Sequence, residues 1–158
     1  MSSPISETEV KQAQAPHNLF ISGLFVFDLL LTPAIIGLKI GMLGMLIPVL
    51  CSGGLIAYIY LRGTKTSSSF VAAHWKLAYR RGLLLFAGYG ISAVLIFIAW
   101  LFSLSIQQAS MGHIIWTALT LIAIVPTLAM VMVTMVMEIS AATAALKRQI
   151  PGVSAPAV

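Results

Sequence analysis

Long runs of apolar residues constrain this chain more than any other feature of its sequence. Residues 19–61 contain two charged side chains, Asp28 and Lys39, and residues 83–137 contain none. A helix needs about 20 apolar residues to cross the hydrocarbon core of a bilayer, so each run is long enough for two crossings. With 59% hydrophobic and 8% charged residues, the chain has the composition of an integral membrane protein. We therefore expect four spans, at residues 19–37, 40–61, 83–104 and 114–137.

The predicted fold class is all-α, an integral membrane bundle of four transmembrane helices in one domain, residues 19–148. A tight turn at residues 37–41 separates the first two spans, because its two glycines permit backbone angles that other residues resist. The polar residues 1–18 are predicted to form a flexible cytoplasmic tail, and residues 149–158 a disordered one.

Residues 67–82 form a polar-to-amphipathic interval between the two apolar halves. At about 100° per residue, His74 and Trp75 fall on an apolar arc, while Lys76 and Arg80 lie on the other side. This pattern predicts an amphipathic juxtamembrane helix before the third span. Its candidate contacts with a lipid headgroup or a partner are His74, Lys76, Arg80 and Arg81. His74 could instead pack at the interface with its ring bonded to water or to a carbonyl.

Basic residues are distributed unevenly between the two membrane faces. Lys39 falls alone on one face of the four-span layout, and the other basic residues fall on the opposite face: Lys11, Arg62, Lys65, Lys76, Arg80, Arg81, Lys147 and Arg148. By the positive-inside rule, we expect both termini and the central loop in the cytoplasm. This orientation also explains the net charge of +5, so no nucleic-acid partner is predicted.

Asp28 lies at the middle of the first predicted span and needs a physical reason to be there. An ionised Asp at a helix centre costs roughly 2.5–3.5 kcal/mol, so its side chain should face the bundle interior. The other spans also carry small polar groups near their midpoints. We predict a buried polar layer made of Asp28, Ser52, Ser92 and Thr127, with Asp28 bonded to Thr127 or to the carbonyl that Pro126 leaves free. The layer is either a structural hydrogen bond or a proton-binding site.

The fourth span carries a polar stripe along one face. Its members share a narrow sector of the helical wheel: His113, Thr120, Thr127, Thr134 and Glu138. The stripe could line a path for protons or a solute. Alternatively, it could be a packing seam in which threonine hydroxyls bond back to their own helix.

Motifs with known chemistry are absent from the sequence. It has no phosphate-binding glycine loop, nucleophile elbow or paired carboxylates, so we predict no enzymatic activity and no catalytic, cofactor or metal site. His17 and His74 are expected on the cytoplasmic side and His113 on the outer side. This placement is unfavourable for a transmembrane bis-histidine haem site within one chain. A haem shared with another subunit stays open.

One short segment resembles a known group of proteins. The run Leu61-Arg62-Gly63-Thr64, the cluster Ala73-His74-Trp75-Lys76 and Arg80 precede an apolar span. Together they resemble small uncharacterised bacterial membrane proteins that are distantly similar to the Tic-type channel component of the chloroplast inner envelope. The resemblance covers chiefly residues 61–104, and this chain lacks the Gln that often follows the aromatic residue in that group. It implies a four-helix or three-helix integral membrane protein without a particular activity, and we expect this chain in the inner membrane of a bacterium.

Two functions from different classes fit these observations. The first is a non-enzymatic accessory or scaffold subunit that binds other membrane proteins, or itself, through its helical faces and its basic cytoplasmic surface. The second is a small oligomeric proton-coupled transporter or channel that uses Asp28. Small multidrug transporters also combine four spans with an acidic residue in the first span. Their dual-topology members need balanced loop charges, which this chain does not have.

Overall fold

The structure is a computed structural model that describes residues 5–38 and 40–151, and predictions about residues 1–4, Lys39 and residues 152–158 lie outside it. Most of the described residues are helical, and none of them belongs to a strand. The elements are α1 (Glu7–Gly23), the π-helix η1 (Leu24–Leu31), α2 (Thr32–Gly37), the 3-10 helix η2 (Met42–Met45), α3 (Leu46–Thr64), α4 (Ser69–Leu104) and α5 (Ala109–Leu146).

Four helical stretches in the described part of the chain are long and apolar enough to cross a membrane. They are Glu7–Gly37, Leu43–Thr64, Ser69–Leu104 and Ala109–Leu146. The all-α class and the four candidate spans predicted from the apolar runs are therefore confirmed.

The contacts between helices divide the chain into two compact units, where the sequence predicts one domain. Unit 1 comprises residues 1–82 and 134–158, and unit 2 comprises residues 83–133. Helices α4 and α5 are 36 and 38 residues long, so each contributes one part to each unit. Unit 1 thus contains all the described helices before α4, the start of α4 and the end of α5.

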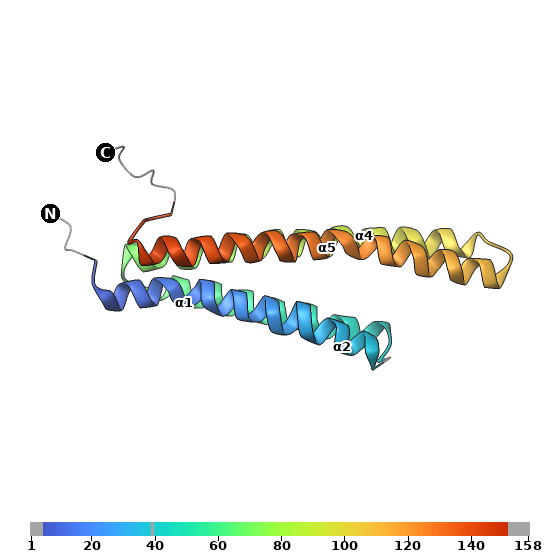
Figure 1. Cartoon of the computed structure of the whole chain (residues 1–158), viewed down its shortest axis with the longest axis horizontal. Coiled ribbons are helices and arrows are strands. Elements are labelled where there is room, and N and C mark those ends of the chain that lie inside the picture. The colour runs from blue at the N-terminus through green and yellow to red at the C-terminus, as the bar shows by residue number, and fades with distance from the viewer. Residues whose placement is uncertain (1–4, 39, 152–158) are drawn as a thin grey trace. The chain divides into compact units, whose positions relative to one another are not determined.

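Helix α1 begins much earlier than the predicted first span. The Ser6 hydroxyl accepts the Glu9 amide at 3.2 Å, and the Glu9 carboxylate accepts the Ser6 amide at 2.9 Å. This reciprocal pair is a capping box, which satisfies amides that a helix start leaves free. The prediction of a flexible tail is therefore wrong for residues 7–18. Helices α1, η1 and α2 follow one another as a single rod (Figure 1).

A π-helical stretch surrounds Asp28 in this rod. Pro33 has no amide hydrogen to offer, and the backbone amide of Thr32 bonds to the carbonyl of Phe27, five residues back. The Thr32 hydroxyl donates to the same carbonyl at 3.0 Å. Single π-helical turns occur frequently at functional sites. Asp28 is buried, with 8% of its surface exposed.

The turn between the first two candidate spans lies where the glycines predict it. Helix α2 ends at Gly37, and Gly41 has a φ of 90°, a backbone conformation that favours glycine. Helix η2 then leads into α3.

Helix α4 is continuous over Ser69–Leu104, so the predicted juxtamembrane helix is not a separate element. Its apolar arc packs against protein in unit 1. The Trp75 ring contacts Tyr58 of α3, with 6.3 Å between ring centroids. A Cβ atom added at Gly63 would lie 2.9 Å from Cβ of Trp75. The first turns of α4 are therefore held by α3.

Unit 2 is a hairpin in which α4 and α5 run side by side in opposite directions (Figure 1). Thr127 of α5 bonds to Ser92 of α4, with 2.8 Å between the two hydroxyl oxygens. A Cβ atom at Gly88 would lie 2.8 Å from Cβ and Cγ of Met130. The small residues Gly88 and Ser92, which the sequence suggests as a packing surface, thus allow α5 to approach closely.

Replacing Gly88 with Leu is expected to lower the free energy of unfolding by about 2 kcal/mol, because the new side chain meets Met130 at its rigid Cβ. Gly90→Leu is the matched control, since nothing lies within 4 Å of a Cβ at that position. Unfolding in mixed detergent micelles measures both variants. Equal losses for the two would contradict the close packing at Gly88.

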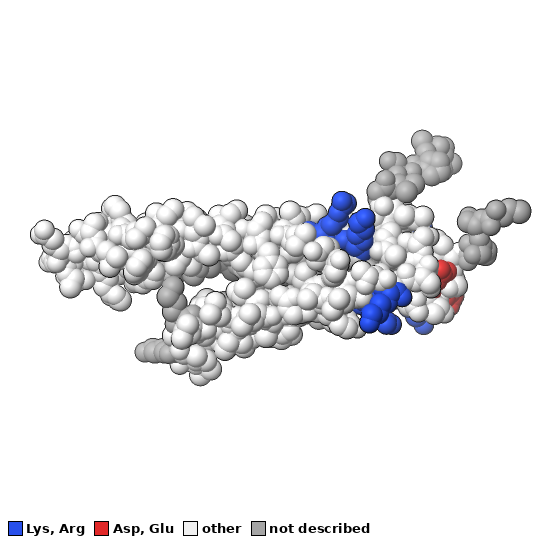
Figure 2. Space-filling view, turned by 180° about the vertical axis from the view of Figure 1, so that it is seen from behind, with Lys and Arg blue, Asp and Glu red and all other residues white. Residues whose placement is uncertain are grey.

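The charged residues belong to unit 1 and its terminal segments, because residues 83–133 contain none. Figure 2 shows the Lys, Arg, Asp and Glu atoms gathered on a limited part of the visible surface. The large apolar side chains exposed on the described helices include Leu43, Leu50, Leu121 and Ile122. Such a surface suits lipid rather than water.

Candidate functional site

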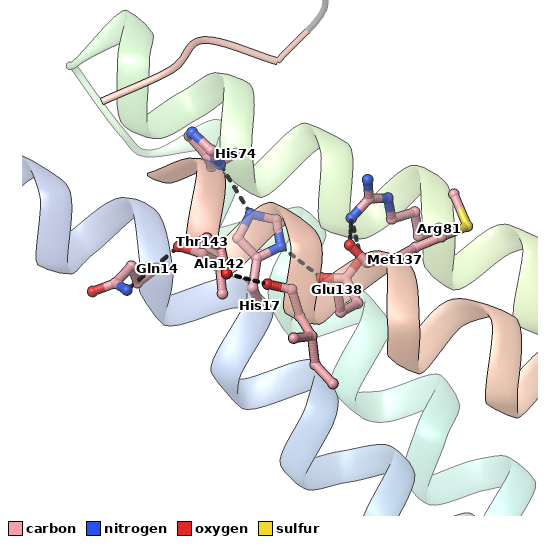
Figure 3. Close-up of polar contacts among 9 residues, drawn as sticks. Gln14, His17, His74, Arg81, Met137, Glu138, Ala142 and Thr143 are labelled. Atoms are coloured by element: carbon pink, nitrogen blue, oxygen red, sulfur yellow. Dashed lines mark hydrogen bonds and ion pairs between the residues drawn. The ribbon is translucent and has the colours of Figure 1, made fainter. Parts of the chain in front are cut away.

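Three titratable side chains from three helices meet in the interior of unit 1. His17 of α1, His74 at the start of α4 and Glu138 near the end of α5 each have 0% of their surface exposed. His17 Nδ1 lies 2.6 Å from Glu138 Oε2, and His17 Nε2 lies 2.9 Å from His74 Nδ1. Figure 3 shows the His17 ring bridging the two partners. Buried ionisable groups that contact one another are typical of functional sites.

Two further groups close the ends of this arrangement. His74 Nε2 lies 3.1 Å from the carbonyl oxygen of Gln149, just beyond the end of α5. At the other end, the Arg81 guanidinium lies 3.4 Å from Glu138 Oε1 and also donates to the carbonyl of Met137. We call His17, His74, Arg81 and Glu138 the buried cluster.

The packing of α1 explains why His17 points inward. The buried positions of the helix include Ala13, Pro16, His17 and Phe20, which recur at intervals of one helical turn. Gln14 Nε2 donates to the carbonyl of Ala142 at 3.4 Å and ties α1 to α5 (Figure 3).

The partners of the two imidazoles determine where the hydrogens lie. The Gln149 carbonyl can only accept, so His74 Nε2 must carry a hydrogen for that contact to be a hydrogen bond. The three contacts from Glu138 to Gln149 need one hydrogen each, whereas two neutral imidazoles supply only two. A third proton, on Glu138 or on one of the rings, completes the chain.

Arg81 balances the charge of Glu138 and not that of this extra proton. With Arg81 and Glu138 both ionised, the buried cluster is electrically neutral when both rings are neutral, but one contact then lacks its hydrogen. Leaving one buried polar group without its hydrogen bond costs about 1–3 kcal/mol. Adding the proton completes every contact and leaves one net positive charge, which burial disfavours. Each protonation state therefore carries one cost: the neutral cluster lacks a hydrogen bond, and the protonated cluster carries a buried net charge.

The predicted polar layer forms two pairs, one in each unit. The Ser52 hydroxyl lies 3.4 Å from Asp28 Oδ2 in unit 1. In unit 2, Ser92 contacts Thr127 through both the hydroxyl and the backbone amide of Thr127. The structure thus brings together Asp28 with Ser52, and Ser92 with Thr127.

Of the four residues predicted to contact lipid or a partner, two have buried partners and two are exposed. His74 has no exposed surface, and the guanidinium of Arg81 turns inward to Glu138. Their assignment as lipid or partner contacts is corrected, because buried hydrogen-bond partners hold both side chains. Lys76 and Arg80 are exposed on the same stretch of α4.

The polar stripe of α5 has different surroundings along its length. Thr134 and Glu138 are fully buried in unit 1. Thr127 bonds to α4 within unit 2, and His113 is exposed near the start of α5. At Thr127 the stripe is a packing seam, and at Glu138 it joins the buried cluster.

Sequence reasoning missed His17 and Glu138 as members of one site. Two signals in the sequence point toward them. Ser6 and Glu9 have the spacing of a capping box, which moves the start of the helix ahead of His17. Glu138 is the one carboxylate in an otherwise uncharged polar stripe.

In the part of the chain that the structure describes, no group of three or more His, Cys, Asp or Glu side chains is arranged to hold a metal ion. The fold and its four candidate spans have the architecture of a multi-pass helical membrane protein. Models of known protein families, curated proteins and solved structures include no match to this chain.

Proposed function

We propose that this chain is a small proton-coupled membrane transporter or channel in which the buried cluster binds and passes a proton. The observation that carries this proposal is the unbroken series of contacts from Glu138 through His17 and His74 to the Gln149 carbonyl, at 2.6, 2.9 and 3.1 Å. Asp28, the acidic residue that the sequence suggests for this role, is a second protonatable group on the same rod.

The proton has three positions within the cluster. With the proton on Glu138, the carboxylic acid donates to His17, and each ring donates onward toward Gln149. When that proton moves from Glu138 to His17 Nδ1, His17 becomes an imidazolium. When His17 then passes the hydrogen on its Nε2 to His74 Nδ1, His74 becomes the imidazolium. These states differ only in the positions of hydrogens along the existing hydrogen bonds, so the heavy atoms do not move.

Loss of the proton weakens one particular contact. The contact between His74 and Gln149 is the longest of the three, at 3.1 Å, and Gln149 is an exposed residue beyond the end of α5. Releasing this contact leaves the shorter ones intact. Proton binding is therefore coupled to the position of the segment that follows α5.

The orientation follows from the positive-inside rule. Both termini and the start of α4 lie in the cytoplasm, since the basic residues other than Lys39 fall on that side. Lys76 and Arg80 then lie at the inner leaflet, where each contributes about 1 kcal/mol toward anionic lipid. The membrane is the inner membrane of a bacterium, in keeping with the resemblance of residues 61–104 to bacterial membrane proteins.

His17→Gln tests the proposal, because Gln keeps one donor and one acceptor but cannot pass a proton through its side chain. Purified protein is reconstituted into vesicles that contain a pH-sensitive dye, with the membrane potential clamped by potassium and valinomycin. We expect protein-dependent decay of an imposed pH gradient, slowed about a hundredfold in His17→Gln, as is typical for loss of one proton-transfer group.

The matched control is His113→Gln, which removes an exposed histidine of α5 that lies in unit 2. This variant should move protons at the rate of the unchanged protein. Equal rates for His17→Gln and the unchanged protein would contradict the role of the buried cluster. The thermal unfolding of both variants shows whether each is folded.

The accessory-subunit function is the second candidate, and the large exposed apolar surface favours it. In the most apolar window of Ala109–Leu146, 17% of the residues are buried within the chain, so other membrane helices could cover this face. Purification in mild detergent separates the two functions. A foreign membrane protein in fixed stoichiometry, together with no proton movement in vesicles, would support the accessory role.

A further inference from the structure

A cavity of about 440 Å³ opens in unit 1 where α1, α3 and the start of α4 contribute its walls. Its volume falls within the range of small-ligand sites. Its polar lining consists of Gln12, Arg62, Lys65, Thr66 and Ser67. No carboxylate contributes to the described lining.

The polar and apolar parts of the lining are ordered along the helices. Arg62 lies near the end of α3, and Tyr58 lies about one turn deeper in the same helix. On α1, Gln12 is near the start and Leu19 lies about two turns further in. Trp75 likewise follows the polar residues that precede α4. The lining therefore has a basic, polar end, which we call the mouth, and an apolar, aromatic end at which Trp75 is buried while Leu19 and Tyr58 are exposed.

The two cations at the mouth are available to a ligand. Among the described residues, neither Arg62 nor Lys65 takes part in an ion pair. The carboxylate of Glu9 is held by Ser68 at 2.6 Å and by Ser6. An anion with two or more oxygens suits this mouth, because the guanidinium offers paired donors and the lysine a compact charge.

We propose that this cavity binds the phosphate group of an anionic phospholipid, with an acyl chain along Leu19, Tyr58 and Trp75. The arrangement of the lining supports this ligand, because its charged head matches the polar end of the cavity and its apolar chain matches the apolar end in one orientation. Aromatic side chains at this level of a membrane helix also suit the headgroup boundary. The site is separate from the buried cluster and does not depend on proton transfer.

Fluorescence of Trp75 tests the proposal, because this ring is part of the cavity wall. The variant Trp100→Phe/Trp116→Phe keeps Trp75 as the only tryptophan. It is titrated in mild detergent with phosphatidylglycerol that carries brominated acyl chains. We expect saturable quenching. Adding Arg62→Gln and Lys65→Gln should weaken the affinity about thirtyfold, because each of these basic residues contributes to the binding of an anionic lipid.

The matched control is Lys147→Gln/Arg148→Gln, which removes two exposed charges just beyond the end of α5 that do not line the cavity. This control should bind as tightly as its parent. Native mass spectrometry of the chain with all its tryptophans should show one retained phosphatidylglycerol, lost in Arg62→Gln/Lys65→Gln. Unchanged binding in that variant would overturn the site. Displacement of the lipid by inorganic phosphate at equal concentration, or equal quenching by brominated phosphatidylcholine, would overturn the assignment to an anionic lipid.

Discussion

Replacing Glu138 with Leu is expected to lower the free energy of unfolding by about 3–5 kcal/mol, the loss typical of breaking a buried ion pair on one side. Glu138 has no exposed surface and contacts both His17 and Arg81. Its removal leaves His17 Nδ1 without its carboxylate and leaves the guanidinium of Arg81 without its counter-ion. Unfolding in mixed micelles, followed by circular dichroism, measures the loss.

A double-mutant cycle separates the ion pair from simple packing. Arg81→Met/Glu138→Leu replaces both charges with apolar side chains, so it should cost at least about 1 kcal/mol less than the sum of the two single changes. Arg80→Met is the matched control, because Arg80 is exposed and neighbours Arg81 on α4. Paired with Glu138→Leu, it should be additive. Additive losses for the Arg81 pair would mean that the ion pair does not stabilise the fold.

The helical layout follows from the sequence because membrane spans are specified locally. The apolar runs predict the four candidate spans, and Gly37 and Gly41 predict the turn between the first two. The approach of helices at Gly88 also follows from the sequence, since small residues at helical spacing mark close packing. Each of these features depends on residues that are near one another in the chain.

The buried cluster could not be predicted in the same way. His17 and Glu138 are separated by 121 residues, and no local pattern specifies the register between their two helices. The polar composition of residues 1–18 favours a tail, whereas the capping by Ser6 and Glu9 produces a helix. If residues 1–18 are taken as a tail, His17 lies outside the helical bundle, and its place in the interior cannot be predicted.

The two polar groups of the first rod lie at different depths. His17 lies in the first half of the rod, in α1, and Asp28 follows about 16 Å further along, given 1.5 Å per helical residue. Both are buried, and both contact side chains from other helices of unit 1. In the proposed orientation, His17 is nearer the cytoplasm and Asp28 nearer the middle of the membrane.

Replacing Asp28 with Asn is expected to leave the stability almost unchanged while slowing proton movement by about a hundredfold, the loss typical of removing one proton-transfer group. Asn keeps a neutral hydrogen-bonding side chain next to the Ser52 hydroxyl, which lies 3.4 Å from Oδ2 of Asp28, but it cannot release a proton. The vesicle assay and thermal unfolding measure the two properties. Ser52→Ala is the control, since it removes the hydroxyl and keeps the carboxyl group. Proton movement at the unchanged rate in Asp28→Asn would assign Asp28 a structural role, in which its hydrogen bond fixes the register between η1 and α3.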